Sequence, residues 1–143
     1  ASPMTMQDGI RAVQQAIVEE QLLDRVRQQG ARLRALLVER FGGHAHVGDI
    51  RGRGLLQALE LVADRASKRP FAPDLRLHAR VRAEALARGL MIYAMGGTID
   101  GQRGDHILLA PPFIVTDADL EMIVDRLAAA LDAALARTDQ AAA

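Results

Sequence analysis

Apolar side chains recur at helical spacing over residues 12–41, and arginines fall largely between them. This pattern predicts one long amphipathic helix, or two consecutive helices divided near Glu20, ending at Gly42-Gly43. Gly30 falls inside the helix, where the missing side chain allows close packing against another element. The apolar positions are Val13, Ile17, Leu22, Leu23, Val26, Leu33, Leu36, Leu37 and Phe41.

Two apolar runs of strand length follow, at residues 47–50 and 55–62. Between them lies Arg51-Gly52-Arg53-Gly54, whose glycines predict a tight turn that joins a pair of strands. The second run is apolar on both alternating faces except at Gln57 and Glu60. Such a run is typical of a strand in the middle of a sheet.

A polar loop with prolines at residues 63–73 leads to a second predicted helix, which Asp74 would cap and which would run to residue 88. Gly89 suits the position after a helix end, where the chain reverses in a left-handed conformation. A third strand is predicted at residues 90–94.

Four glycines lie within residues 96–104, before a fourth predicted strand at residues 106–110 that Pro111-Pro112 ends. The loop lacks the G-x-x-x-x-G-K-[ST] motif and no helix follows it, which excludes a nucleotide P-loop. We therefore interpret it as the loop of a hairpin between antiparallel strands.

Thr116, with Asp119 three residues later, predicts the capping box of a last helix. The resulting order is α-β-β-α-β-β-α, without internal repeats. It predicts a two-layer α+β domain with a mainly antiparallel sheet of about four strands and helices packed on one face.

Length and charge favour one globular domain, because the chain has 143 residues and eighteen acidic side chains balance eighteen basic ones. Zero net charge gives no reason to expect nucleic acid or a membrane surface as a partner. The absence of cysteine excludes a disulfide framework and a thiol nucleophile. We find neither a membrane-length apolar run nor a signal-peptide pattern, and so expect a cytoplasmic protein.

Arg51 and Arg53 are candidates for binding a carboxylate or a phosphate, because a guanidinium offers a rigid fork of donors. The alternative is that they are solvated residues that shape the turn. A buried Glu60 would need a partner, and pairing with a nearby arginine is favoured over a role as catalytic base. His44 and His46 have a spacing that suits a metal, but no third ligand is evident nearby, so we interpret them as loop residues.

Four segments of the chain stand out by their order and spacing. They are Val47-Gly48-Asp49-Ile50-Arg51-Gly52-Arg53-Gly54-Leu55, Ala58-Leu59-Glu60-Leu61, Arg88-Gly89-Leu90 and Gly104-Asp105-His106-Ile107-Leu108-Leu109-Ala110-Pro111-Pro112-Phe113-Ile114-Val115-Thr116. Together they resemble the C-terminal small domain of class III pyridoxal-phosphate-dependent aminotransferases. The resemblance covers about residues 13–135, and we assign the domain to residues 13–137. Residues 1–12 are expected to form an altered or flexible segment at the domain border, and residues 138–143 a frayed tail.

The resemblance implies a fold type I enzyme, usually a homodimer, that transfers an amino group from an amine or ω-amino acid to a keto acid. In this family a larger domain binds most of the pyridoxal phosphate and supplies the lysine that holds it. Lys68 is the only lysine in this chain, and it lies in the polar loop. We therefore expect an inactive fragment that contains no catalytic residue, binds no cofactor and lacks its large domain.

Two positions bear on the substrate. The ornithine and acetylornithine branch has a carboxylate-binding arginine where this chain has Leu108, which argues against that branch. Arg103 resembles the loop arginine with which ω-amino-acid transaminases bind carboxylates, although it could equally be a solvated loop residue.

The segment before the long helix reads Ser2-Pro3-Met4 in place of the family's Gly-His-Pro. The rival hypothesis is a free-standing binding or regulatory module with a carboxylate site near Arg51 and Arg53.

Overall fold

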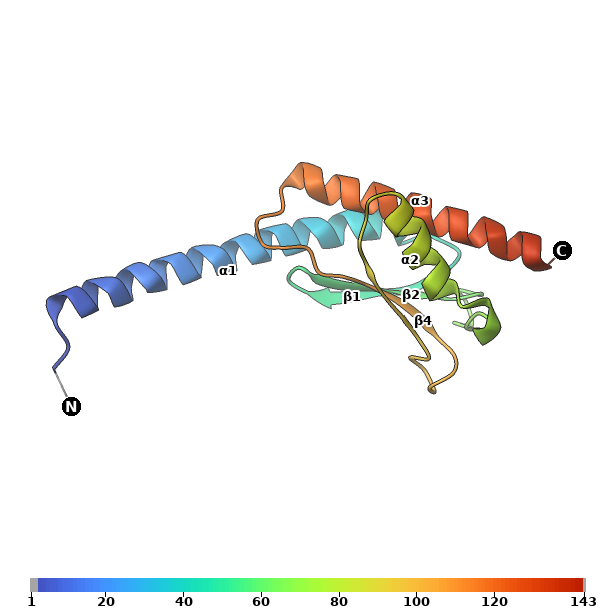
Figure 1. The fold of residues 1–143 in the computed structure, drawn as a ribbon, viewed down its shortest axis with the longest axis horizontal. Coiled ribbons are helices and arrows are strands. Elements are labelled where there is room, and N and C mark those ends of the chain that lie inside the picture. Colours follow the sequence, from blue (N-terminus) through green and yellow to red (C-terminus); the bar gives the residue numbers. More distant parts are fainter. Residues whose placement is uncertain (1–2, 143) are drawn as a thin grey trace.

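The computed structural model describes the backbone of residues 3–142 and the side chains of residues 3–139. These residues form a four-stranded antiparallel sheet with helices packed on one of its faces (Figure 1). The predicted α+β class and element order are therefore confirmed. The elements are α1 (Met6–Phe41), β1 (Val47–Arg53), β2 (Leu56–Leu61), the 3-10 helix η1 (Pro73–Leu75), α2 (Leu77–Ala87), β3 (Tyr93–Gly96), β4 (Asp105–Leu109) and α3 (Asp117–Ala142).

The strands lie in the order β1-β2-β4-β3, so β2 is an inner strand, as its apolar pattern predicted. Side chains alternate between the two faces of the sheet. Gln57, Leu59 and Leu61 of β2 are buried beneath the helices, whereas Ala58 and Glu60 point to the helix-free face and are half-buried. The polar positions of the sheet are thus gathered mainly on the helix-free face.

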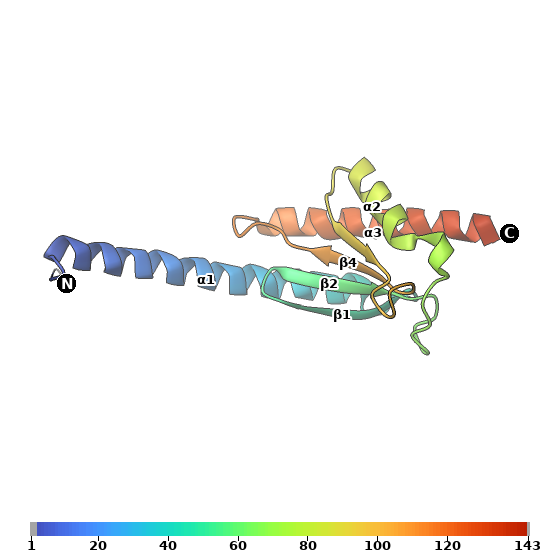
Figure 2. The same cartoon turned by 60° about the horizontal axis from the view of Figure 1, so that its bottom comes forward.

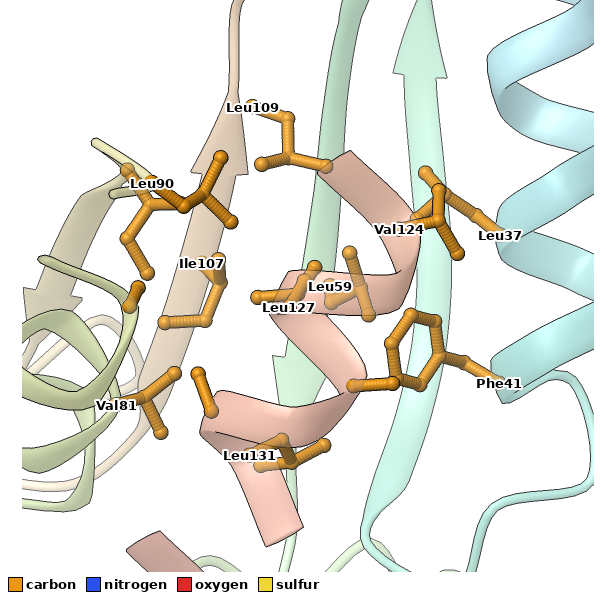
Figure 3. Close-up of a cluster of buried hydrophobic side chains, with 14 of the residues drawn as sticks. Leu37, Phe41, Leu59, Val81, Leu90, Ile107, Leu109, Val124, Leu127 and Leu131 are labelled. Carbon is orange, nitrogen blue, oxygen red and sulfur yellow. The ribbon is translucent and has the colours of Figure 1, made fainter. Parts of the chain in front are cut away.

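The core lies between the sheet and α3, which packs with α1 on one side and α2 on the other (Figure 3). Leu127 and Leu131 of α3, Leu59 of the sheet and Phe41 of α1 belong to the same buried cluster. Figure 2 shows the second half of α1 running beside α3 over the sheet, while its first half extends beyond both. Of the helices that the structure describes, none has the length and apolarity to span a membrane.

Helix α1 is one continuous helix of 36 residues, without a division near Glu20, and it begins at Met6 rather than Ala12. Thr5 and Asp8 form a capping box, in which the Asp8 amide donates to Thr5 Oγ1 over 3.1 Å and the Thr5 amide donates to Asp8 Oδ2 over 3.1 Å. The cap fixes the start of a segment whose apolar period is weak. Whether residues 1–12 mark a domain border stays a prediction.

The turn between β1 and β2 is shorter than predicted. Arg51, Gly52 and Arg53 belong to β1, and only Gly54 and Leu55 form the turn, with Gly54 at φ +55°. Helix α1 crosses this turn closely, because a Cβ added at Gly30 would lie 2.5 Å from the carbonyl carbon of Gly54. The predicted close packing at Gly30 is therefore confirmed.

Helix α2 is not capped by Asp74, which lies in η1 instead. The carboxylate of Asp105, from β4, accepts a hydrogen bond of 3.0 Å from the His78 amide in the first turn of α2. Gly89 has φ +75°, as expected after a helix end. The third strand begins at Tyr93 rather than residue 90, and Leu90 and Ile92 lie buried in the connection that precedes it.

Helix α3 begins with the predicted capping box. The Thr116 amide donates to Asp119 Oδ2 over 3.0 Å, and the Asp119 amide donates to Thr116 Oγ1 over 3.1 Å. The helix continues to Ala142, beyond the expected fraying at residue 138. Thr138 is buried, and its hydroxyl donates to the Ala134 carbonyl over 3.1 Å. Residue 143, the last of the predicted tail, lies outside the described residues.

Candidate functional site

The helix-free face of the sheet brings charged side chains of three strands together. The register aligns Asp49 with Glu60 and Glu60 with His106, so β1, β2 and β4 each contribute one residue to the same row. Arg51 lies in the neighbouring row, opposite Ala58. We call Asp49, Arg51, Glu60 and His106 the charged cluster, and Arg51 is the predicted site residue that belongs to it.

The Arg51 side chain is 60% exposed, and its guanidinium contacts Asp49, Glu60 and His106. Its Nη2 lies 3.8 Å from Glu60 Oε2, and its Nε lies 3.7 Å from Asp49 Oδ2. The Glu60 side chain is only 16% exposed, and its pairing with Arg51 agrees with the interpretation made from the sequence. Arg53, the last residue of β1, is exposed and lies opposite Leu56.

Arg103 lies in the loop of the β3–β4 hairpin, residues 97–104, which we call the Gly loop. The antiparallel pairing of Gly96 with Asp105 confirms the predicted hairpin. The Gly97 amide donates to the Gly104 carbonyl over 2.9 Å, which closes the loop at its base. The Ile99 amide also donates to the Arg103 carbonyl over 2.9 Å. The Gly loop is therefore an ordered turn structure that projects from the sheet.

Asp100 holds Arg103 within the Gly loop. Its carboxylate accepts hydrogen bonds from the Arg103 amide over 2.7 Å and from Arg103 Nε over 2.8 Å. The bond from the Arg103 amide, together with the side-chain bond, lowers the pKa of Asp100 to about 2. The Arg103 side chain is 55% exposed, so a carboxylate arriving from solvent can reach its guanidinium.

His106 connects the Gly loop to Arg51, and sequence reasoning missed it. Arg51 Nη2 donates to His106 Nε2 over 3.0 Å, and His106 Nδ1 is hydrogen bonded to the Thr98 hydroxyl. His106 is buried, with 8% of the residue exposed. Burial lowers the pKa of His106, and Arg51 lowers it further, whereas Glu60 acts in the opposite direction. The available signal was a histidine near the start of β4, directly before the apolar run 107–109.

A buried polar pair, His78 and Asp105, joins α2 to β4 and was also not predicted from the sequence. His78 Nδ1 lies 2.6 Å from Asp105 Oδ1, and Asp105 is 5% exposed. The ring of His78 covers Gly96, where an added Cβ would lie 2.3 Å from His78 Cε1. This pair fixes the first turn of α2 next to the base of the Gly loop.

His44 and His46 lie in the loop between α1 and β1, as expected, and both rings have partners. His46 Nδ1 lies 3.0 Å from the Val62 carbonyl, and its ring packs against Phe71 with centroids 5.3 Å apart. His44 Nδ1 accepts a hydrogen bond of 3.0 Å from the His46 amide. These contacts account for both side chains as parts of the loop's packing.

Two surface grooves are separate from the charged cluster. A polar groove of about 520 Å³ lies between α1 and α3, where Arg32 pairs with Glu121 at 3.0 Å. An apolar groove of about 260 Å³ is lined by Tyr93, Leu109 and Pro111, beside the connection from β4 to α3. Neither groove includes Arg51, Arg53 or Arg103.

The family model described as aminotransferase class-III matches residues 6–131, which include every strand and most of the three helices. The chain belongs to the class III aminotransferase family. The matched residues include those of the charged cluster and of the Gly loop.

Curated and solved aminotransferases agree with this assignment. The chain is 38% identical over 125 residues to an uncharacterized aminotransferase of Schizosaccharomyces pombe, covering 87% of this chain and 27% of that protein. It is 37% identical over 137 residues to the taurine–pyruvate aminotransferase of Rhodobacter capsulatus, covering 96% and 28%. A PLP-bound aminotransferase mutant from Vibrio fluvialis has a TM-score of 0.72 at 33% identity, covering 82% and 24%. The chain thus spans about a quarter of its relatives' length.

Proposed function

We propose that this chain is the C-terminal small domain of a pyridoxal-phosphate-dependent aminotransferase that transfers an amino group from an amine or ω-amino acid to a keto acid. The observation that carries the proposal is the match of residues 6–131 to the family within a chain that spans a quarter of its relatives. A relative whose name pairs taurine with pyruvate supports a small keto acid as the acceptor.

The residues of this chain do not fit the role of binding pyridoxal phosphate. Lys68 is exposed on the loop between β2 and η1, and its φ of +58° places it in a turn. A lysine that forms a covalent bond with a carbonyl cofactor needs a desolvated site that lowers its pKa, and an exposed turn offers none. We infer that the cofactor and its lysine belong to a large domain, and that this chain alone is inactive.

The surface of α1 supports the existence of that partner. Met6, Ile10, Val13 and Ile17 are between 49% and 83% exposed, and we call them the outer stripe. With 3.6 residues per turn they lie about 150° around the helix from the buried Leu33, Leu37 and Phe41. This half of α1 extends beyond the sheet in both views (Figures 1 and 2). An apolar stripe directed away from the domain's own core is suited to contact a second folded unit.

We assign the carboxylate of the substrate to Arg103. Its guanidinium is half-exposed at the end of a loop and already pairs with one carboxylate, that of Asp100, which a substrate could replace. Arg51 and Arg53 stay candidates for substrate binding. The contacts of Arg51 with Glu60 and His106 favour a role in shaping the sheet face. The intact enzyme is proposed to be a cytoplasmic homodimer.

The steady-state kinetics of the intact enzyme with Arg103→Ala test this assignment. The variant should raise KM for carboxylate-bearing amino donors about tenfold, equivalent to about 1.4 kcal/mol, because it removes a charge-assisted contact. Simple amines without a carboxylate should keep their kinetics. Arg27→Ala is the matched control, since Arg27 is an exposed arginine on α1 that pairs with Asp24 at 3.6 Å. An equal loss with both classes of donor would contradict the role of Arg103.

A further inference from the structure

Three polar side chains from separate segments meet at the helix-free face beside the Gly loop. Arg51 comes from the edge strand β1, His106 from the inner strand β4, and Thr98 from the Gly loop itself. His106 bonds to both of the others, through Nε2 to Arg51 and through Nδ1 to Thr98. The imidazole is thus the only one of the three groups that contacts both the sheet and the loop within this cluster.

The partners of His106 determine its protonation state. A guanidinium has donors only, so Arg51 requires Nε2 of His106 to be an acceptor. The ring must then be neutral with its proton on Nδ1, and this N–H donates to the Thr98 hydroxyl. A second proton on Nε2 would place a donor against the donor of Arg51 and would end that hydrogen bond.

The Gly loop folds back closely over the start of β4, which makes the contact with Thr98 possible. A Cβ added at Gly104 would lie 2.7 Å from Thr98 Oγ1, and Gly104 has φ +104°. A side chain at that position would therefore push Thr98 away from His106. The glycine and the histidine together determine where the loop lies.

We propose that His106 is a positioning residue, which in its neutral form anchors the Gly loop to the sheet through Thr98. The role of the anchor in placing Arg103 for a substrate carboxylate rests on the proposed function above. The anchoring itself depends only on the contacts of this chain. Protonation at Nε2 sets the ring against the Arg51 guanidinium and ends the bond that holds the ring in place beside β1. The displaced ring no longer presents Nδ1 to Thr98, so acidification loosens the segment that carries Arg103.

The charges around His106 set the sign of this pH dependence. Asp49 and Arg51 face it from β1, Glu60 from β2, and Asp105 precedes it in β4. Burial outweighs the three carboxylates, so the pKa of His106 in the folded protein lies below its usual value of 6.5. Below about pH 6.5 the unfolded chain therefore binds more protons than the folded chain, which lowers the stability of the folded state. The anchor itself is lost as the pH falls through the lower pKa that His106 has in the folded chain.

Amide hydrogen exchange of the Gly loop, measured by NMR on this chain, tests the proposal. The reporters are the amides of Gly97 and Ile99, both hydrogen bonded within the loop. As the pH is lowered, the protection of these amides, corrected for the intrinsic pH dependence of exchange, should fall. The midpoint of this fall should match the midpoint of the titration of the His106 ring resonances. The rings of His46 and of His78, which lies against Gly96, are followed as controls. Loop protection that follows His78 or no histidine would overturn the proposal.

Two variants separate the anchor from general stability. Thr98→Val removes only the hydroxyl of an exposed loop residue, so the fold should persist, while protection of Gly97 and Ile99 falls at least threefold at neutral pH and no longer depends on His106. His106→Asn keeps an N–H donor near the Nδ1 position but cannot titrate, so it should make loop protection independent of pH. Unchanged protection in Thr98→Val would refute the anchor.

The kinetics of the intact enzyme test whether the anchor affects substrate binding. Thr98→Val should raise KM for carboxylate-bearing donors and leave kcat nearly unchanged, since the loop is loosened but Arg103 is retained. A loosened loop without any change in KM would leave the anchor standing and would contradict the assigned role of Arg103. Failure of the two ideas is therefore distinguishable.

Discussion

The two glycines of α1 show how much the effect of a single residue depends on whether another part of the backbone packs against it. Gly30 lets the backbone of α1 touch the β1–β2 turn, where a Cβ would meet the carbonyl carbon and oxygen of Gly54, both at 2.5 Å. Gly9, in the exposed first half of the same helix, has nothing within 4 Å of an added Cβ. The two glycines share a helix and differ only in their surroundings.

Gly30→Ala should therefore destabilise the chain by about 1–3 kcal/mol, because the added methyl group overlaps backbone that cannot move away without shifting the turn. Gly9→Ala should instead stabilise it by about 0.5–1 kcal/mol through helix propensity. Urea unfolding followed by circular dichroism measures both free energies of unfolding. Equal effects of the two substitutions would contradict the observed contact between α1 and the turn.

Secondary structure elements were predictable where the signal is local. The capping box at Thr116 and Asp119 and the central position of β2 follow from residue types within a few positions. The cap of α2 did not follow, because Asp105 is supplied by a strand far along the chain. His106 was missed for the same reason, since its partners Arg51 and Thr98 become neighbours only in the folded sheet.

Asp105→Ala should lower the free energy of unfolding by about 2–3 kcal/mol, because it leaves the amide and the ring of His78 without their buried acceptor. Asp74→Ala, at the cap position predicted from sequence, should change it by less than about 0.5 kcal/mol, as is usual for an exposed surface position. Thermal or urea unfolding of the two variants gives the comparison. A larger loss for Asp74→Ala would mean that α2 is capped locally.

At the scale of the whole molecule, the chain has a closed hydrophobic core but also an exposed apolar surface. The core between the sheet and α3 is closed by α1 and α2. The outer stripe of α1 is exposed, and Lys68, the only lysine, lies on an exposed loop. These features agree with a covering domain whose catalytic partner is elsewhere in the polypeptide. The order of the family motifs led to this proposal from the sequence alone, whereas the direction of the outer stripe required the structure.

The central claim is that the cofactor and its lysine lie outside this chain. The most direct test is to add pyridoxal phosphate to the purified 143-residue chain and record its visible absorption together with amino transfer from a panel of amines to pyruvate. We predict no stable protein-bound cofactor band and no amino transfer, while the intact enzyme shows both. A stable band that Lys68→Ala removes, accompanied by turnover, would contradict the account.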